Sequence, residues 1–256
     1  MRSILVPAIM MLGIAASGFS QDRGVTVLET RPGVHVSLYW ATQPNALRTL
    51  VLFPGGEGEI SIKAGVPTSK NFLVRSLDEF LRFPVDVVVM DRPSDFSLTR
   101  QARTSSQHLD DVRKVIEFVS QKFVNHIWLV GTSNGTVSVA FVAGQKLPGS
   151  LEGIVLTSSI VAPAERFSVP RQNLGGISVP VLLIQHQKDA CRFCSPSLLP
   201  GVLPLFTSSP VKKLILATGG SNPRGDPCGP LHWHGFIGME SEAVGLICNW
   251  INSPEA

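Results

Sequence analysis

The chain is poor in charged residues. Only 16% of its 256 residues are Asp, Glu, Lys or Arg, against roughly 25% in typical soluble domains. The formal net charge is +3, and the basic residues are scattered along the chain. The sequence therefore lacks the concentrated positive charge of a nucleic-acid-binding surface, and no nucleic-acid partner is expected.

Long apolar runs are also scarce. Beyond the N-terminus, no segment approaches the roughly 20 apolar residues that a bilayer-spanning helix needs. The one marked run, Ile4–Ala16, follows Arg2 and leads into small residues, which is typical of a secretory signal. We predict that residues 1–20 are a signal peptide cleaved near Ser20, with export to the periplasm or medium; an uncleaved anchor is the alternative.

No internal repeat, low-complexity tract or composition break divides residues 21–256, so a single domain is predicted. Apolar periodicity predicts alternating strands and helices after an opening antiparallel hairpin. Such alternation favours a mostly parallel central sheet with helices on both faces, a three-layer α/β sandwich. The predicted strands are Val25–Glu29, Val34–Trp40, Leu47–Phe53, Val85–Met90, His126–Val130, Leu151–Thr157, Val179–His186 and Val211–Ala217. The predicted helices are Lys70–Arg82, His108–Phe123, Thr136–Gln145, a short Leu198–Thr207 limited by prolines, and Met239–Ile251.

One pentapeptide joins a predicted strand to a predicted helix, Gly131-Thr132-Ser133-Asn134-Gly135. A Gly-x-Ser-x-Gly sequence in this context is typical of a nucleophile elbow. The turn is so sharp that the serine takes a positive φ, and the flanking glycines avoid collisions between strand and helix. We therefore expect Ser133 to be a nucleophile; a structural glycine-rich turn is the alternative.

A serine nucleophile needs a base, and the base needs an orienting acid. Asp189 follows a predicted strand at the sheet edge where ligands gather, and Asp226 is a rival within one late loop. Asp91 and Asp95 precede the serine and fit the order Ser, Asp, His poorly. His232 and His234 compete as the base, and His186 lies close to Asp189 in sequence.

With these residues the chain resembles a secreted bacterial serine hydrolase of the α/β-hydrolase fold, over nearly everything after the signal segment. The matching features are the elbow, a Gly-rich loop after an early strand, Asp189, and His234-Gly235-Phe236 before the last helix. The resemblance to the family's His-Gly-aromatic pattern selects His234 as the base and leaves His232 beside it. It implies a catalytic set of Ser133, Asp189 and His234.

Stabilising an oxyanion requires preorganised N–H donors. One should be the backbone N–H of Asn134, the residue after the nucleophile. The other should come from Gly55-Gly56-Glu57-Gly58, with Gly56 preferred and Glu57 the alternate. The loop could also be a plain flexible turn; it is not a P-loop, because no Lys-Ser/Thr follows the glycines.

The four cysteines, Cys191, Cys194, Cys228 and Cys248, are expected to form disulfides if the protein is exported. Three pairings are possible, and the sequence does not choose among them. We hypothesise a Cys191–Cys228 bond, which would tie the acid loop to the base loop. A zinc site from Cys191, Cys194, Cys228 and His232 is the alternative, but its spacing exceeds that of usual zinc fingers.

The sequence therefore predicts hydrolysis of a carboxylic ester or related acyl compound through an acyl-enzyme, with no metal or organic cofactor. About twenty residues, Ser158 to Ser178, stand where this fold usually inserts a cap, so the cap should be minimal and the open site suited to esters or exposed acyl groups. The expected partner is a small-molecule or acyl substrate, and the fold does not choose which one. A peptidase or acyltransferase could use the same three residues. The competing class is an exported hydrolase-fold protein that binds a ligand without turnover.

Overall fold

The computed structural model describes residues 21–123, 126–145, 147 and 151–255; the predicted signal segment lies outside them. Eight strands form one sheet, in the spatial order β1-β2-β6-β3-β7-β8-β9-β10. Their bounds are β1 Arg23–Arg31, β2 Val34–Ala41, β3 Arg48–Phe53, β6 Val85–Pro93, β7 His126–Thr132, β8 Leu151–Thr157, β9 Val181–His186 and β10 Lys212–Ala217.

The sheet is mostly parallel, as predicted. The hairpin β1–β2 is antiparallel, and β2 pairs antiparallel with β6, whereas all pairs from β6 to β10 are parallel. The central strands are buried along nearly their whole length, which explains their continuous apolar runs. Because the strands are parallel, the loops after β3, β7 and β9 leave the same edge of the sheet.

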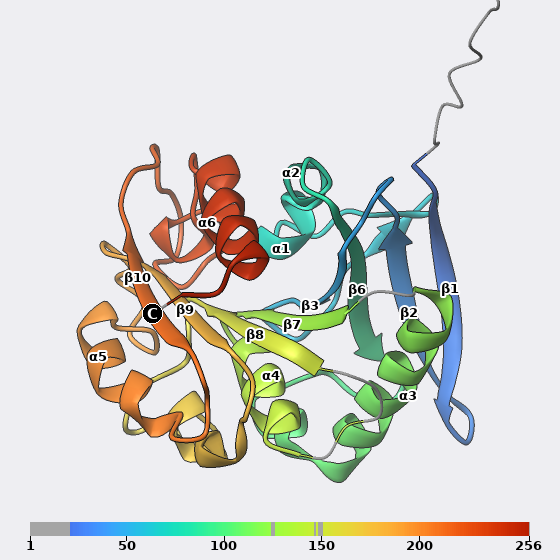
Figure 1. The fold of residues 1–256 in the computed structure, drawn as a ribbon, viewed down its shortest axis with the longest axis horizontal. Helices are drawn as coiled ribbons and strands as arrows, with labels where there is room; N and C mark the ends of the chain where they lie inside the picture. The colour runs from blue at the N-terminus through green and yellow to red at the C-terminus, as the bar shows by residue number, and fades with distance from the viewer. Residues whose placement is uncertain (1–20, 124–125, 146, 148–150, 256) are drawn as a thin grey trace, which may run out of the picture.

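Helices cover both faces of the sheet, which confirms the three-layer prediction (Figure 1). On one face α3 (Ser106–Lys122), α4 (Gly135–Ala143) and α5 (Leu199–Val202) bury their apolar side chains in one core. On the other face α1 (Phe72–Arg75), α2 (Leu77–Phe80) and α6 (Glu240–Asn252) form a second core. The sheet therefore separates two apolar cores and leaves its strand ends free for polar loops.

Two predicted helices are shorter than expected. The helix predicted over Lys70–Arg82 breaks at Ser76, whose backbone (φ −98°, ψ 14°) ends α1 and begins α2. The helix predicted over Leu198–Thr207 has one α-helical turn, α5, between 3₁₀ turns at Pro196–Leu198 and Leu203–Leu205. Prolines in the first positions of these last three turns account for the interruptions between residues 196 and 205, since each removes a backbone donor.

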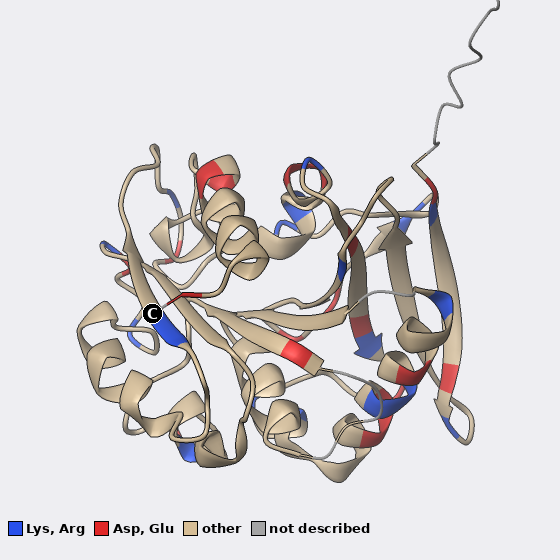
Figure 2. Cartoon of the chain, viewed as in Figure 1, with Lys and Arg blue, Asp and Glu red and all other residues tan. Residues whose placement is uncertain are grey.

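A short hairpin, β4 (Ile62–Lys63) and β5 (Val66–Pro67), is an addition that the sequence did not indicate. No helix in the described part of the chain is both long and apolar enough to cross a membrane. Figure 2 shows Lys and Arg mixed with Asp and Glu around α3 and the strands beside it, rather than gathered into one basic face.

Candidate active site

The pentapeptide makes the sharp strand-to-helix turn that its glycines predicted. Ser133 follows β7 with φ 53°, in the left-handed region. Its N–H donates to the Thr157 carbonyl (3.0 Å), which ties the turn to the neighbouring strand. A Cβ on Gly131 would lie 2.6 Å from the Gly135 oxygen, and one on Gly135 would overlap the Phe53 carbonyl. Any residue larger than glycine at these two positions would push the turn apart.

The candidate base and acid meet although 45 residues separate them. His234 lies in a 3₁₀ turn, Trp233–Gly235, and its Nδ1 is 2.9 Å from Asp189 Oδ2. The Asp189 side chain is fully buried and the His234 side chain is 4% exposed. The other carboxylate oxygen of Asp189 accepts from Cys191 N–H (2.9 Å), and Gln185 Nε2 also donates to Oδ2. These bonds fix the histidine ring with Nδ1 facing the acid.

The opposite nitrogen, His234 Nε2, is buried and has no hydrogen-bond partner among the described residues. His234 and Ser133 both line a cavity of about 510 Å³ at the strand ends. Asp189 is not among the lining residues and lies behind the histidine. The arrangement brings a serine and a histidine with an unpaired ring nitrogen to the same cavity.

The rest of the lining is mainly polar or glycine. It consists of Gly55, Gly56, Glu57, Glu59, Ser61, Ser69, Lys70, Asn71, Phe72, Thr132, Cys228, Pro230 and Gly235. The exposed large apolar side chains of the described chain lie elsewhere, at Val25, Val27, Leu47, Val66, Leu205 and Leu216. None of these exposed apolar side chains is among the residues that line the cavity.

The glycine-rich loop Pro54–Gly58 forms one wall of this cavity. A Cβ on Gly55 would lie 2.8 Å from Ser133 Cβ, so only glycine allows the loop to approach the serine this closely. Gly56 has φ 58°, and the Gly58 N–H closes the turn on the Gly55 carbonyl (3.1 Å). Within the described chain, the N–H groups of Gly56, Glu57 and Asn134 have no hydrogen-bond acceptor. These three N–H groups are the candidates for binding an oxyanion, and Gly56 and Glu57 are equally unpaired.

The rival histidines lie near the site but do not line the cavity. His186 stacks on Trp233 with ring centroids 4.8 Å apart, and its Nε2 lies 3.2 Å from the Gly219 carbonyl. Burial lowers the pKa of His186, so the ring favours its neutral form. His232 packs edge-on against the same tryptophan. Both are part of the wall that supports the loop of His234.

The rival carboxylates have other partners. Asp226 Oδ1 accepts the N–H of Cys228 (2.7 Å) and caps that turn. Asp91 Oδ1 accepts the N–H groups of Ile60 and Arg92, and Asp95 is paired with an arginine. Asp91 and Asp95 line a second cavity of about 700 Å³ beside the first, so neither is placed to orient His234.

Two residues that the sequence analysis did not single out hold the acid and base loops. Ser158, which follows β8 with φ 48°, donates its hydroxyl to the His234 carbonyl (2.6 Å). Gln185, on the buried strand β9, donates to Asp189 and to the Cys194 carbonyl. A polar residue inside a buried strand, and a serine at a strand's carboxyl end, are the signals that could have identified them.

The structure joins Cys191 to Cys228, the pair that we hypothesised, and thus links the acid loop to the base loop. Cys194 and Cys248 are free and buried. Burial raises the pKa of both thiols, so neither is a reactive thiolate.

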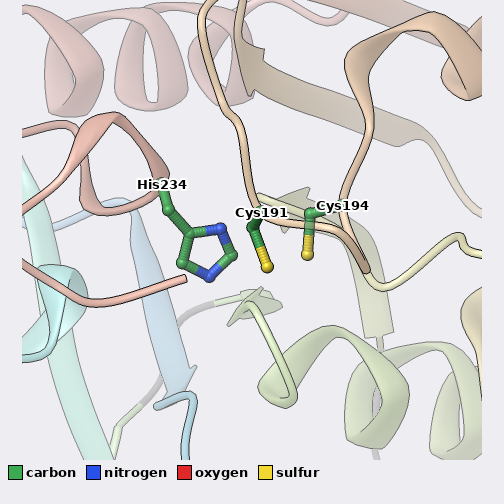
Figure 3. A group of neighbouring side chains, drawn as sticks. All are labelled: Cys191, Cys194 and His234. Carbon is green, nitrogen blue, oxygen red and sulfur yellow. The ribbon is translucent and has the colours of Figure 1, made fainter. Parts of the chain in front are cut away.

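Three of the side chains near the disulfide are close enough to suggest a metal site. Figure 3 shows His234, Cys191 and Cys194, whose possible ligand atoms all lie within 4.8 Å of one another. Cys191 is bonded to Cys228 and cannot offer a thiolate, and His234 Nδ1 is bonded to Asp189. In this state the three residues do not fit a zinc ion, and His232, which the zinc alternative requires, is not in the group.

The sheet order, the elbow and the loops at one sheet edge are those of the α/β-hydrolase fold, and comparison with solved structures agrees with this assignment. No protein-family model and no curated protein matches the chain. Similar structures include a lid-less α/β serine hydrolase from Xanthomonas campestris, at 17% identity and TM-score 0.63, covering 93% of this chain and 98% of that one. An esterase from Pyrococcus furiosus has 13% identity and TM-score 0.65, with 96% and 98% covered. A dienelactone hydrolase from Anabaena variabilis has 11% identity and TM-score 0.64, with 91% and 97% covered.

Proposed function

We propose that the protein is a serine hydrolase that cleaves small carboxylic esters through an acyl-enzyme. The observation that carries this proposal is the buried His234 Nδ1–Asp189 contact of 2.9 Å. It leaves Nε2 unpaired in a ring that lines the same cavity as Ser133. An imidazole held in this way can take a proton from a serine hydroxyl through Nε2.

In the proposed reaction Ser133 Oγ attacks the ester carbonyl carbon while His234 Nε2 takes the hydroxyl proton. The negative charge that develops on the carbonyl oxygen is bound by the N–H groups of Asn134 and Gly56, with Glu57 as the alternate for the second. Collapse of this intermediate expels the alcohol, which receives its proton from His234, and leaves the acyl group on Ser133. Water then attacks the acyl group on Ser133 in the same way, with His234 taking its proton, and the carboxylic acid is released. Asp189 orients His234 and stabilises its positive form.

The lining of the cavity supports short or polar acyl groups as substrates. Phe72 and Pro230 are its main apolar side chains, next to charged Glu57, Glu59 and Lys70. A long acyl chain gains affinity by burying apolar area, at roughly 25 cal/mol per Å², and this lining offers little such area. We therefore expect acetyl and butyryl esters to be cleaved far better than esters of ten or more carbons.

The decisive experiment treats the oxidised protein with a fluorophosphonate probe and locates the label by peptide mass analysis. We expect the label on Ser133 and its loss in Ser133→Ala. Ser61→Ala, a second serine of the same cavity, is the matched control and should be labelled normally. Failure to label the folded wild-type protein would refute the proposal and favour the non-catalytic binding protein. Ester and amide substrates with identical acyl groups then separate an esterase from a peptidase, and added alcohols reveal acyl transfer.

We also propose that the protein is a single domain of residues 21–256 that is exported after cleavage near Ser20. The Cys191–Cys228 disulfide supports an oxidising compartment. Mass analysis of the N-terminus of protein recovered from the periplasm or medium should find a chain that begins near Gln21. Recovery of the whole chain from the cytoplasm alone would contradict export.

A further inference from the structure

Arg103 is a buried arginine directly beneath the glycine-rich loop. It lies in a 3₁₀ turn, Ala102–Thr104, and is 1% exposed. Its Nε donates to the Leu98 carbonyl and its Nη1 to Ser138 Oγ, both at 2.9 Å. Within the described chain it forms no ion pair with a carboxylate. Burying an unpaired charge is costly, so its position calls for an explanation.

The second terminal nitrogen of Arg103 holds the glycine-rich loop. Nη2 donates to the Pro54 carbonyl (2.9 Å) and the Gly56 carbonyl (3.2 Å). The Gly56 carbonyl also accepts from the Asn134 side chain (3.0 Å), and the Gly55 carbonyl accepts from Gly58 N–H. All three successive carbonyls of the loop thus have donors.

These bonds fix the direction of the loop's N–H groups. The described chain has no cis peptide bond, and a trans peptide is planar with its C=O and N–H pointing in opposite directions. The Gly56 carbonyl, held by Arg103, shares its peptide unit with the Glu57 N–H, and the Gly55 carbonyl, held by the Gly58 N–H, shares its peptide unit with the Gly56 N–H. Arg103 also fixes the preceding peptide unit through the Pro54 carbonyl, so the peptide units on both sides of Gly56 cannot rotate. The unpaired N–H groups of Gly56 and Glu57 are then held in one orientation before any substrate arrives.

Burial lowers the pKa of Arg103 to about 9, which leaves the guanidinium charged at neutral pH. Its positive charge stands behind the loop whose front faces Ser133. A fixed charge in a water-excluded place favours negative charge nearby more strongly than the same charge in water.

We propose that Arg103 is a positioning residue for the oxyanion-binding loop, which it clamps through the Pro54 and Gly56 carbonyls while supplying positive charge behind it. This inference rests on the proposed hydrolase function. Because the negative charge exists only in the transition state and the tetrahedral intermediate, loss of the clamp should lower kcat and leave KM nearly unchanged. A residue that merely stabilises the fold would not lower kcat while leaving KM unchanged.

The test compares Arg103→Lys and Arg103→Met with the wild type on a nitrophenyl acetate substrate. We expect kcat to fall roughly 10- to 100-fold, somewhat less than the loss of a whole oxyanion donor, with KM within about twofold. Lysine keeps the charge but cannot form four hydrogen bonds, so its kcat should lie between those of wild type and methionine. Arg31→Met is the control, since Arg31 is another largely buried arginine, paired with Asp111, but does not line the cavity; its kcat should be unchanged.

A second measurement uses a phenylboronic acid, whose boron accepts the Ser133 oxygen and becomes a tetrahedral anion while the hydroxyl proton passes to His234. Its inhibition constant should rise in the Arg103 variants by about the same factor as kcat falls. Unchanged kcat and boronate affinity in folded variants would overturn the proposal. A rise in KM by the same factor as the fall in kcat would also overturn it. If neither variant folds, Asn134→Ala removes the other donor to the Gly56 carbonyl, and an unchanged kcat there would overturn it.

The two proposals fail in different ways. If the wild-type protein is not labelled at Ser133 and hydrolyses no ester, the proposed function fails, and the role of Arg103 fails with it. If the wild type is active and the Arg103 variants match it in kcat and boronate affinity, only the role of Arg103 fails.

Discussion

Removal of the Cys191–Cys228 disulfide should strongly lower the stability of the folded protein. Cys191 and Cys228 are 37 residues apart in sequence, and opening a loop of this length is expected to cost roughly 4 kcal/mol in the chain-entropy model. Domains are stable by about 5–15 kcal/mol, so this bond would carry a large part of the total. At about 2–4 °C per kcal/mol, the midpoint of thermal unfolding should fall by roughly 8–16 °C.

The variant for this experiment is Cys191→Ala combined with Cys228→Ala. A single substitution at Cys228 would leave the Cys191 sulfur near that of Cys194, within 4.8 Å, and a new disulfide there would confuse the result. Urea unfolding of the double variant should show a midpoint lower by more than about 1 M, for a slope near 3 kcal/mol/M. Cys248→Ala, which removes a buried sulfur outside any loop closure, is the control and should shift the midpoint much less.

The same variant should also lose activity before it unfolds. Cys191 N–H donates to Asp189 Oδ1 and Cys228 lines the cavity, so both ends of the bond touch the proposed site. We expect a reduced kcat at temperatures where circular dichroism still reports a folded protein. A loss of stability below about 1 kcal/mol would refute the loop-closure argument, and unchanged kcat would refute the link between the disulfide and the site.

Three further outcomes are expected. Asp189→Asn should lower kcat by about 10³- to 10⁴-fold, because the amide cannot support the positive form of the proposed base; near-normal steady-state kinetics would contradict its role. Burial lowers the pKa of His108 to about 3 from 6.5, so below pH 6.5 the unfolded state binds a proton that the folded state does not. The free energy of unfolding should therefore decrease as the pH falls from 6.5 to 3, by up to about 1.4 kcal/mol per pH unit. In urea titrations His108→Gln should remove that slope, and equal slopes would show that His108 is not its source. Gly135→Ala should prevent correct folding, since its Cβ would overlap the Phe53 carbonyl; Gly201→Ala, with open space around it, should be tolerated, and equal thermal midpoints for the two variants would contradict this reasoning.

The sequence predicted the fold well because the main signals are local. Continuous apolar runs identified the parallel strands, and the helical period of α3 was strong over its whole length. The elbow around Ser133 could be predicted because the glycine spacing is dictated by collisions between a strand and the helix that follows it. The order of Asp189 and His234 along the chain then matched the loops at one sheet edge, where the structure brings the two side chains together.

The roles of the supporting residues were not predicted because they arise from contacts distant in sequence. Ser158 reaches the carbonyl of a residue 76 positions away, and Arg103 reaches carbonyls 47 and 49 positions away. Residue type alone does not signal such a role, since serine and arginine are ordinary surface residues; only the place of Ser158 at the carboxyl end of a strand pointed to it. The Cys191–Cys228 pairing was a hypothesis and not a derivation for the same reason: which thiols meet depends on how loops after different strands lie side by side.

Backbone strain connects these supporting contacts to the proposed chemistry. Ser133, Ser158 and Phe236 all have positive φ, between 48° and 56°, and a side chain with a Cβ adopts this conformation only where its surroundings enforce it. The Ser133 N–H donates to Thr157 and the Ser158 N–H to Ile184, both at 3.0 Å, so each strained turn continues the hydrogen bonding of the neighbouring strand. Phe236 is fully buried against Phe72, with ring centroids 4.9 Å apart. Ser133 is the proposed nucleophile, Ser158 holds the carbonyl of the proposed base, and Phe236 lies two residues beyond that base. The sheet and the apolar core therefore stabilise the strained turns that orient the polar groups, and a substitution that relaxed one of these turns would stabilise the fold at the expense of the site.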